Sequence, residues 1–260
     1  MKKATITNWD GLFIDLPQQS NAPRAILSLK KAGDFSFDNL AGRAKFLETL
    51  GIDPARACYL KQIHSQTVVS VPAAGVPVAG APTADGSGVA APGVTTPKRG
   101  LTQADGLLTT NCATVLCVTV SDCLPVWLHD PDHGAFGLLH SGWRGTGIAA
   151  TAVQKMHSQF GTRVKDLQVT LGPCIGSCCY NVPRDRSLYF KARFGADSSD
   201  SNGDEYFIDL RQANINLLTA LGVEQITVVD DCTSCQPALS SYRRDGADNF
   251  SLMLAVMGYF

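Results

Sequence analysis

Short apolar runs separated by polar turns recur along the chain, which is typical of buried strands. Two of the longest, residues 113–120 and 135–139, are rich in β-branched and aliphatic side chains. Further runs predict strands at 25–29, 57–60, 67–71, 167–171, 225–229 and 250–256. We therefore expect a fold with at least eight strands.

Three segments have the amphipathic pattern and the end signals of helices. They span residues 37–50, 145–160 and 210–221, and each is followed by a glycine, at Gly51, Gly161 and Gly222. Asp209 stands in the capping position of the third. Strands and helices alternate irregularly, which favours a mixed α/β or α+β fold over a regular parallel barrel.

Residues 72–100 have a different composition from the rest of the chain. Ala, Gly, Pro, Val and Thr dominate, proline recurs and no period is visible. This pattern predicts a flexible insert within one domain that spans residues 1–260.

Composition narrows the function classes. Hydrophobic residues make up 45% of the chain and charged residues 17%, as in an ordinary globular enzyme. Lys and Arg total 22 against 23 for Asp and Glu, so no overall charge recruits nucleic acid or membrane, and we expect neither as a partner. Nine cysteines without a secretory signal indicate a reducing compartment, and we predict a cytoplasmic protein.

The stretch 112–147 carries the strongest chemical signal. Cys123 follows the apolar run 113–120, and His140 ends the run 135–139. A thiol and an imidazole delivered by neighbouring strands of a rigid sheet could share a metal ion or form a nucleophile–base pair. Packing as a buried thiol and a hydrogen-bonded imidazole is the alternative for each residue taken alone.

His64 completes a candidate catalytic zinc site with Cys123 and His140. Three protein ligands would leave a fourth position open, and zinc lowers the pKa of a water molecule there to ~7. Asp105 and Asp122 flank the same region. Either could orient a ligand histidine or hold a ribose hydroxyl, and the alternative for both is a turn or helix cap.

Arg144 lies in a turn flanked by glycines, at the expected start of a helix. A guanidinium beside free backbone N–H groups makes an anion or phosphate site. A salt bridge at the helix edge is the alternative interpretation.

Five other cysteines could supply a second, four-thiolate zinc site. They are Cys174, Cys178, Cys179, Cys232 and Cys235. Only the last two have C-x-x-C spacing, their partner would have to be a C-x₃-C or C-x₄-C pair, and the Gly/Pro context indicates a turn. Because an isolated C-x-x-C match is a weak signal, we expect no second metal site.

Six motifs occur together and in order. They are QIH at 62–64, ADGL at 104–107, SDCLP at 121–125, LHSGWRG at 139–145, GPCIG with CCY at 172–180, and SYRRD at 241–245. In these motifs the chain resembles the YfiH/laccase-domain family, also called purine nucleoside phosphorylases or polyphenol oxidases. The resemblance implies a single-domain α/β/β/α sandwich with mixed sheets, similar to YfiH and the toxin deamidases.

The resemblance also implies a site and an activity. It places the family's zinc ligands on His64, Cys123 and His140, with catalysis at the same residues, and we expect Arg144, Gln62 and Asp105 to bind substrate. The implied activity is phosphorolysis of adenosine, inosine, guanosine and methylthioadenosine, with adenosine deamination in addition. Nucleoside and phosphate are then the expected partners, and no oligomeric state is predicted.

Two other functions remain open. A Cys–His hydrolase, with Cys123 as nucleophile and His140 as base, could cleave an amide in a peptide-linked nucleotide or cell-wall precursor. Five histidines and no His-x-His pair exclude a standard multicopper oxidase, which needs roughly ten histidines given copper's preference for imidazole. Copper bound in vitro at the zinc site could still give weak phenol oxidation.

Overall fold

A computed structural model describes residues 1–17, 21–72 and 102–260 of the chain. Its strands form three sheets, and five α-helices and four short 3₁₀ helices connect them. The insert predicted at 72–100 lies outside the described residues except for its first residue.

The largest sheet has seven strands and is mixed. Its order is β1 (Lys2–Ala4), β14 (Gln225–Val229), β10 (Gln168–Leu171), β8 (Leu124–Asp130), β9 (Ala135–Ser141), β6 (Gly106–Thr109) and β5 (Val68–Ser70). The three strands at one edge run parallel, β8 and β9 form an antiparallel hairpin, and β5 pairs with β6 in parallel.

The second sheet has five strands. Its order is β2 (Phe13–Asp15), β3 (Arg24–Ser28), β15 (Met253–Gly258), β7 (Val115–Val120) and β4 (Ala57–Cys58). All pairs are antiparallel except β4 with β7. The C-terminal strand β15 therefore lies between β3 and β7, at the centre of the sheet.

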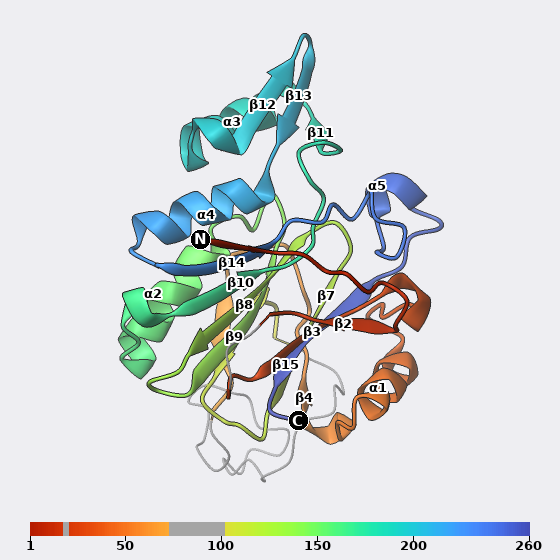
Figure 1. Cartoon of the computed structure of the whole chain (residues 1–260), viewed down its shortest axis with the longest axis vertical. Helices are drawn as coiled ribbons and strands as arrows, with labels where there is room; N and C mark the ends of the chain where they lie inside the picture. Colours follow the sequence, from red (N-terminus) through yellow and green to blue (C-terminus); the bar gives the residue numbers. More distant parts are fainter. Residues whose placement is uncertain (18–20, 73–101) are drawn as a thin grey trace.

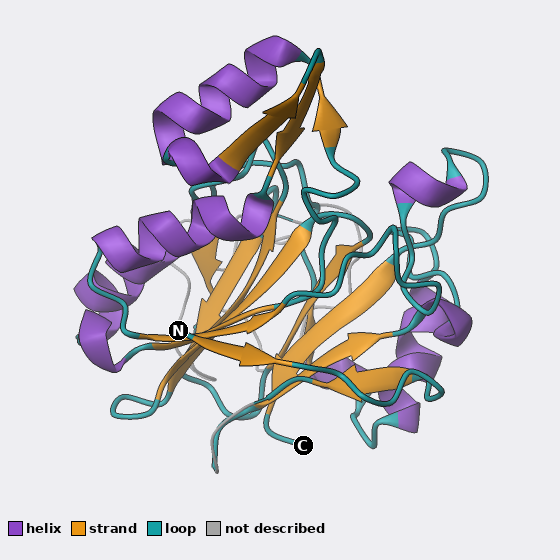
Figure 2. Cartoon of the chain, turned by 45° about the horizontal axis from the view of Figure 1, so that its top comes forward, coloured by secondary structure: helices purple, strands orange, loops and turns teal. Residues whose placement is uncertain are grey.

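The two sheets face one another and helices cover their outer faces, as Figure 2 shows. Leu107, Trp127 and Phe136 of the large sheet share one apolar core with Leu27 and Val118 of the smaller sheet. Helices α2 (Ile148–Phe160) and α4 (Leu210–Ala220) bury the other face of the large sheet. Helix α1 (Leu40–Thr49) covers the smaller one. The predicted α/β/β/α layering is confirmed.

A small lobe stands above these layers at the top of Figure 1. It contains helix α3 (Arg184–Phe194) and a three-stranded antiparallel sheet of β11 (Asn181–Val182), β13 (Glu205–Ile208) and β12 (Ser199–Asn202). The remaining short helices are α5 (Tyr242–Asp245), η1 (Lys30–Ala32), η2 (Pro54–Arg56), η3 (Val164–Asp166) and η4 (Ala196–Ser198). None of the described helices is both long enough and apolar enough to cross a membrane.

All eight predicted strands and all three predicted helices are present, with small differences at their ends. One expectation about their arrangement is wrong. The strands before Cys123 and His140 do not share a sheet, because β7 belongs to the five-stranded sheet and β9 to the seven-stranded one. The turn that contains Cys123 carries the chain from one sheet to the other, so the two residues meet across the sandwich.

Among the elements that the sequence did not predict, strand β8 and helix α3 were missed for opposite reasons. Strand β8 is buried along its whole length, so it lacks the alternation of apolar and polar residues that identifies a strand. Its Val126 faces the helix-side core while its Trp127 faces the core between the sheets. Helix α3 is so polar that only Ser187, Phe190 and Phe194 are buried.

Trp127 connects the two sheets directly. Its indole N–H donates to the main-chain oxygen of Val256 on β15 at 3.0 Å, and its side chain is 1% exposed. Replacement by phenylalanine removes this hydrogen bond and leaves a gap in the core between the sheets.

We therefore expect Trp127→Phe to destabilise the protein by about 2 kcal/mol. The melting temperature should then fall by roughly 4–8 °C. Trp9→Phe is the control, because Trp9 is only partly buried and no hydrogen bond of its indole is seen among the described residues. Equal melting temperatures for the two variants would contradict the role assigned to Trp127.

Candidate metal centre

Three side chains with metal-binding chemistry converge at one edge of the sandwich. Each of His64, Cys123 and His140 offers one ligand atom, and these atoms all lie within 4.8 Å of one another. His64 comes from the loop between β4 and β5, Cys123 from the turn between β7 and β8, and His140 from the end of β9. We call these three residues the ligand trio.

Asp105 forms hydrogen bonds with the segments that carry two of the three ligands, His64 and His140. Its buried carboxylate lies 2.9 Å from Nδ1 of His140 and accepts hydrogen bonds from the backbone N–H groups of Ile63, His64 and Ser65. The Ser65 hydroxyl donates to it as well, at 2.8 Å. With His140 Nδ1 donating to Asp105, Nε2 keeps its lone pair for a metal ion.

The backbone of His64 is held in an unfavourable conformation. Its φ of 59° lies in the left-handed region, which costs a non-glycine residue of order 1–3 kcal/mol. Three consecutive N–H groups donating to one carboxylate can offset that cost. Asp105 therefore sets both the loop that carries His64 and the ring orientation of His140.

Two glycines let the turn after β9 pack against the trio. A Cβ on Gly142 would lie 2.9 Å from Sγ of Cys123 and 3.1 Å from Cδ2 of His64. A Cβ on Gly145 would lie 2.8 Å from the main-chain oxygen of Ser65. Gly142 and Gly145 are thus required because the backbone at these positions lies too close to the trio and its loop for a Cβ atom.

The charges within the trio are strongly coupled. Burial alone would raise the pKa of Cys123, but the adjacent His140 charge and hydrogen bonds with both histidines lower it to about 6. For His140, burial lowers the pKa, while Cys123 and Asp105 together raise it to about 9. Burial also opposes ionisation of Asp105, yet hydrogen bonds from His140 and Ser65 bring its pKa to about 2. Cys123 and His140 thus each favour the charged form of the other.

This donor set fits zinc. Two imidazoles and one thiolate match the three protein ligands of catalytic zinc sites, and the same set also suits copper. The Asp105–His140 contact is the carboxylate–histidine arrangement that commonly supports such ligands. The observed geometry is therefore consistent with the metal site that the sequence predicts at these residues.

Arg144 lies in the turn that packs against the trio, and its guanidinium has no carboxylate partner in the described part of the chain. Its side chain is exposed, with Cζ 5.0 Å from the ring centroid of Trp143. Helix α2 begins only at Ile148, after Gly147 at its cap, so Arg144 lies in the preceding turn. The alternative of a helix-edge salt bridge is wrong for the described residues, and the guanidinium can still bind an anion.

The other two expected substrate-binding residues have structural partners. The Gln62 amide donates to the main-chain oxygen of Thr119 at 2.8 Å and accepts from its N–H at 2.8 Å. Asp105 is 0% exposed and its carboxylate accepts several hydrogen bonds. Substrate binding by Gln62 and Asp105 stays a prediction, and of the alternatives for Asp105 the geometry fits orientation of a ligand histidine.

Asp122 has the capping role given as its alternative. One carboxylate oxygen accepts from the Thr233 hydroxyl at 2.6 Å and the other from the N–H of Arg243 at 2.8 Å. Asp122 therefore ties the turn that carries Cys123 to Thr233 and to helix α5.

Sequence reasoning missed three residues around the centre. Arg186 of α3 has its Cζ 4.1 Å from the ring centroid of Trp143, and Arg243 lies 5.5 Å from that of Tyr180. Burial raises the pKa of Tyr180 to about 12, and the charge of Cys123 adds to that shift. The CCY motif and the SYRRD motif were signals for Tyr180 and Arg243, whereas Arg186 had none, because α3 was not predicted.

Comparison with known proteins gives consistent matches. Residues 20–258 match the sequence model of a family described as multi-copper polyphenol oxidoreductase laccase. A protein of Geobacillus stearothermophilus named purine nucleoside phosphorylase YlmD is 31% identical over 250 residues, which cover 92% of this chain and 86% of that protein. The crystal structure of Bacillus licheniformis hypothetical protein YfiH superposes with a TM-score of 0.75 at 26% identity, covering 92% of this chain and 93% of that one.

A mouse relative named purine nucleoside phosphorylase LACC1 is 33% identical over 151 residues. The match covers 55% of this chain and only 35% of the mouse protein, so the matched segment spans about a third of that relative's length.

The coupled charges predict an unusually reactive cysteine once metal is removed. Cys123 should be alkylated by iodoacetamide with a half-maximal rate near pH 6, because its pKa is about 6 and the reactive thiolate predominates above that pH. In Asp105→Asn the midpoint should move to higher pH, since His140 loses the carboxylate that supports its charge. Mass spectrometry of the Cys123 peptide measures this rate, with the peptide of exposed Cys112 as the reference. A midpoint near 8.5, as for an ordinary thiol, would contradict the coupling.

Proposed function

Because the chain belongs to the family described as multi-copper polyphenol oxidoreductase laccase, and relatives in it are named purine nucleoside phosphorylases, we propose that it is a zinc-dependent purine nucleoside phosphorylase. Inorganic phosphate would replace the purine on the ribose of adenosine, inosine, guanosine or methylthioadenosine, giving free base and a sugar 1-phosphate. The supporting observation is the ligand trio together with Arg144, which has no carboxylate partner among the described residues.

The trio holds the metal in this proposal. Bound zinc supplies a Lewis acid with one coordination position open to substrate or water. His64, Cys123 and His140 are the ligands, and Asp105 keeps His140 in the tautomer with Nε2 available. Asp105 is thus a positioning residue, acting through the ligands rather than on the substrate.

Phosphate binding is assigned to Arg144 and Arg186. Both guanidiniums lie over Trp143, at 5.0 and 4.1 Å from its ring centroid, and neither pairs with a carboxylate among the described residues. Guanidinium groups bind phosphate oxygens through paired N–H donors. Two of them on one aromatic ring, next to the trio, would hold phosphate for attack on C1′ of the ribose.

The same residues could support deamination of adenosine. In that reaction water replaces the amino group at C6 of the purine, and inosine and ammonia leave. It requires the trio but no phosphate, so the contribution of Arg144 would separate the two activities.

The second candidate is a Cys–His amide hydrolase. Its supporting observation is the Cys123–His140–Asp105 arrangement, in which the pKa of the thiol is about 6 and a carboxylate orients the imidazole. A peptide-linked nucleotide or cell-wall precursor would be its substrate. Phenol oxidation at copper ranks third, because five histidines are too few for a trinuclear copper cluster beside the trio.

Zinc removal discriminates between these candidates. We expect purified protein to release base from inosine and adenosine only with phosphate, to lose that activity on chelation, and to regain it with added zinc. His140→Ala should reduce kcat/KM by at least about 100-fold, since it removes a ligand. Activity that survives chelation but ends on alkylation of Cys123 would favour the amide hydrolase instead.

The arginines can be tested separately from the metal. Arg144→Ala and Arg186→Ala should each raise the KM for phosphate about tenfold, since a lost charge-assisted hydrogen bond costs roughly 1.5 kcal/mol. Zinc content and the KM for inosine should change little. Arg184→Ala is the matched control, because Arg184 is an exposed arginine on the same helix. An unchanged KM for phosphate in both variants would overturn this assignment.

A further inference from the structure

A second group of potential metal ligands lies outside the trio. Cys178, Cys179, Cys232 and Cys235 bring their four sulfur atoms within 4.8 Å of one another. Cys174 is not a member, and its Sγ lies instead 3.5 Å from the main-chain oxygen of Ile175. We propose that these four residues, the cysteine cluster, form a closed structural zinc site. The expectation of no second site assumed that a spaced pair was required, whereas the structure uses the adjacent pair Cys178–Cys179.

The sulfur spacing agrees with zinc coordination. Four thiolates at about 2.3 Å from a tetrahedral zinc lie about 3.8 Å from each other. In the structure Sγ of Cys235 lies 3.8 Å from Sγ of Cys178 and 3.5 Å from Sγ of Cys179. All nine cysteines of the chain are free thiols. A disulfide would use two of the four sulfurs, while a soft divalent cation uses all of them.

The backbone around the cluster is arranged for sulfur ligands. Cys232–Cys235 form a tight turn, in which the N–H groups of Cys235 and Gln236 donate to the main-chain oxygen of Cys232 at 3.1 and 2.8 Å. Gly176 N–H donates to Sγ of Cys232 at 3.2 Å. Such a bond supports a metal-bound thiolate from outside the coordination sphere.

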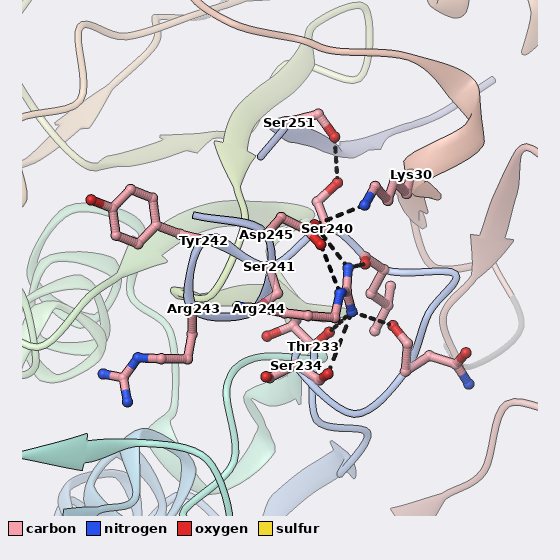
Figure 3. Close-up of polar contacts among 12 residues, drawn as sticks. Lys30, Thr233, Ser234, Ser240, Ser241, Tyr242, Arg243, Arg244, Asp245 and Ser251 are labelled. Carbon is pink, nitrogen blue, oxygen red and sulfur yellow. Dashed lines mark hydrogen bonds and ion pairs between the residues drawn. The ribbon is translucent and has the colours of Figure 1, made fainter. Parts of the chain in front are cut away.

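Two consecutive arginines hold the two halves of the cluster. The Arg244 guanidinium donates to the main-chain oxygens of Thr233 and Gln236, in the turn of the second pair, as the close-up in Figure 3 shows for Thr233. The Arg243 guanidinium donates to the main-chain oxygens of Cys179 and Asn181, in the segment of the first pair. Figure 3 also shows the two side chains pointing in different directions from α5. The sulfur positions are therefore supported independently of any metal.

The cluster is tied to the ligand trio through Asp122. This residue precedes Cys123, and its carboxylate accepts from Thr233, inside the turn of the second pair, and from Arg243. Its main-chain oxygen accepts from the N–H of Ile175 at 3.0 Å. Zinc in the cysteine cluster would join the segment after β10 to the segment after β14 and so stiffen the turn that carries Cys123.

Metal content tests the proposal. Protein purified under reducing conditions and loaded with zinc should contain about two zinc ions per chain by elemental mass spectrometry, one for each site. The double variant Cys232→Ser, Cys235→Ser should contain about one, and so should Cys123→Ala. Cys112→Ser removes an exposed cysteine outside both sites and should leave the count unchanged.

Cys123→Ala keeps the test decisive if the double serine variant does not fold, because its cysteine cluster is intact. After replacement of zinc by cobalt(II), this variant should show the intense thiolate-to-cobalt absorption of a tetrahedral four-sulfur site. The absence of bound metal in this variant would overturn the proposal. So would iron in place of zinc, or recovery of cluster cysteines as disulfides in freshly purified protein. Cys123→Ala should abolish the proposed phosphorylase activity but leave the cysteine cluster intact. A failure of the cluster proposal can therefore be distinguished from a failure of the proposed function.

Discussion

One buried carboxylate sets the candidate active site. Asp105 accepts hydrogen bonds from three consecutive N–H groups of the His64 loop and from the ring of His140. Groups of the protein itself therefore stabilise its charge. An unpaired buried charge would be costly, and this one is stabilised only when loop and strand are both in place. The left-handed backbone of His64 follows from the same constraint. Removing the charge would therefore disturb two metal ligands at once.

The sandwich supplies the third ligand by a different route. Cys123 lies where the chain crosses from the five-stranded to the seven-stranded sheet, so its position depends on how the two sheets pack rather than on one strand pair. Trp127, four residues further along the chain, fixes that packing through its bond to Val256. Asp122, on the other side of Cys123, is anchored to Thr233 and Arg243 beside the cysteine cluster. Core packing and the cluster thus hold the same short turn from its two sides.

The trio and the layered fold were predictable because their signals are local or carried by motifs. His64, Cys123 and His140 each stand in a distinctive motif, and the buried strands have clear apolar runs. The role of Asp105 could not be chosen from sequence, because a carboxylate that orients histidine and one that binds ribose look alike there. Arg186 was beyond prediction, since α3 buries too narrow a face to show a helical period. The convergence of the four cysteines could not be predicted, because Cys178 and Cys179 are adjacent and meet Cys232 and Cys235 only through the tertiary fold.

The family's description refers to copper oxidation, whereas relatives are named purine nucleoside phosphorylases and five histidines are too few for a standard multicopper centre. The proposed function depends on the claim that Asp105 organises His64, Cys123 and His140 into one metal site. Anomalous diffraction measured on both sides of the zinc absorption edge, from crystals of zinc-loaded protein, tests it most directly. The account predicts a zinc peak between these three side chains, with His140 still bonded to Asp105. Crystals that show zinc only elsewhere, with Cys123 and the two histidines free, would contradict it.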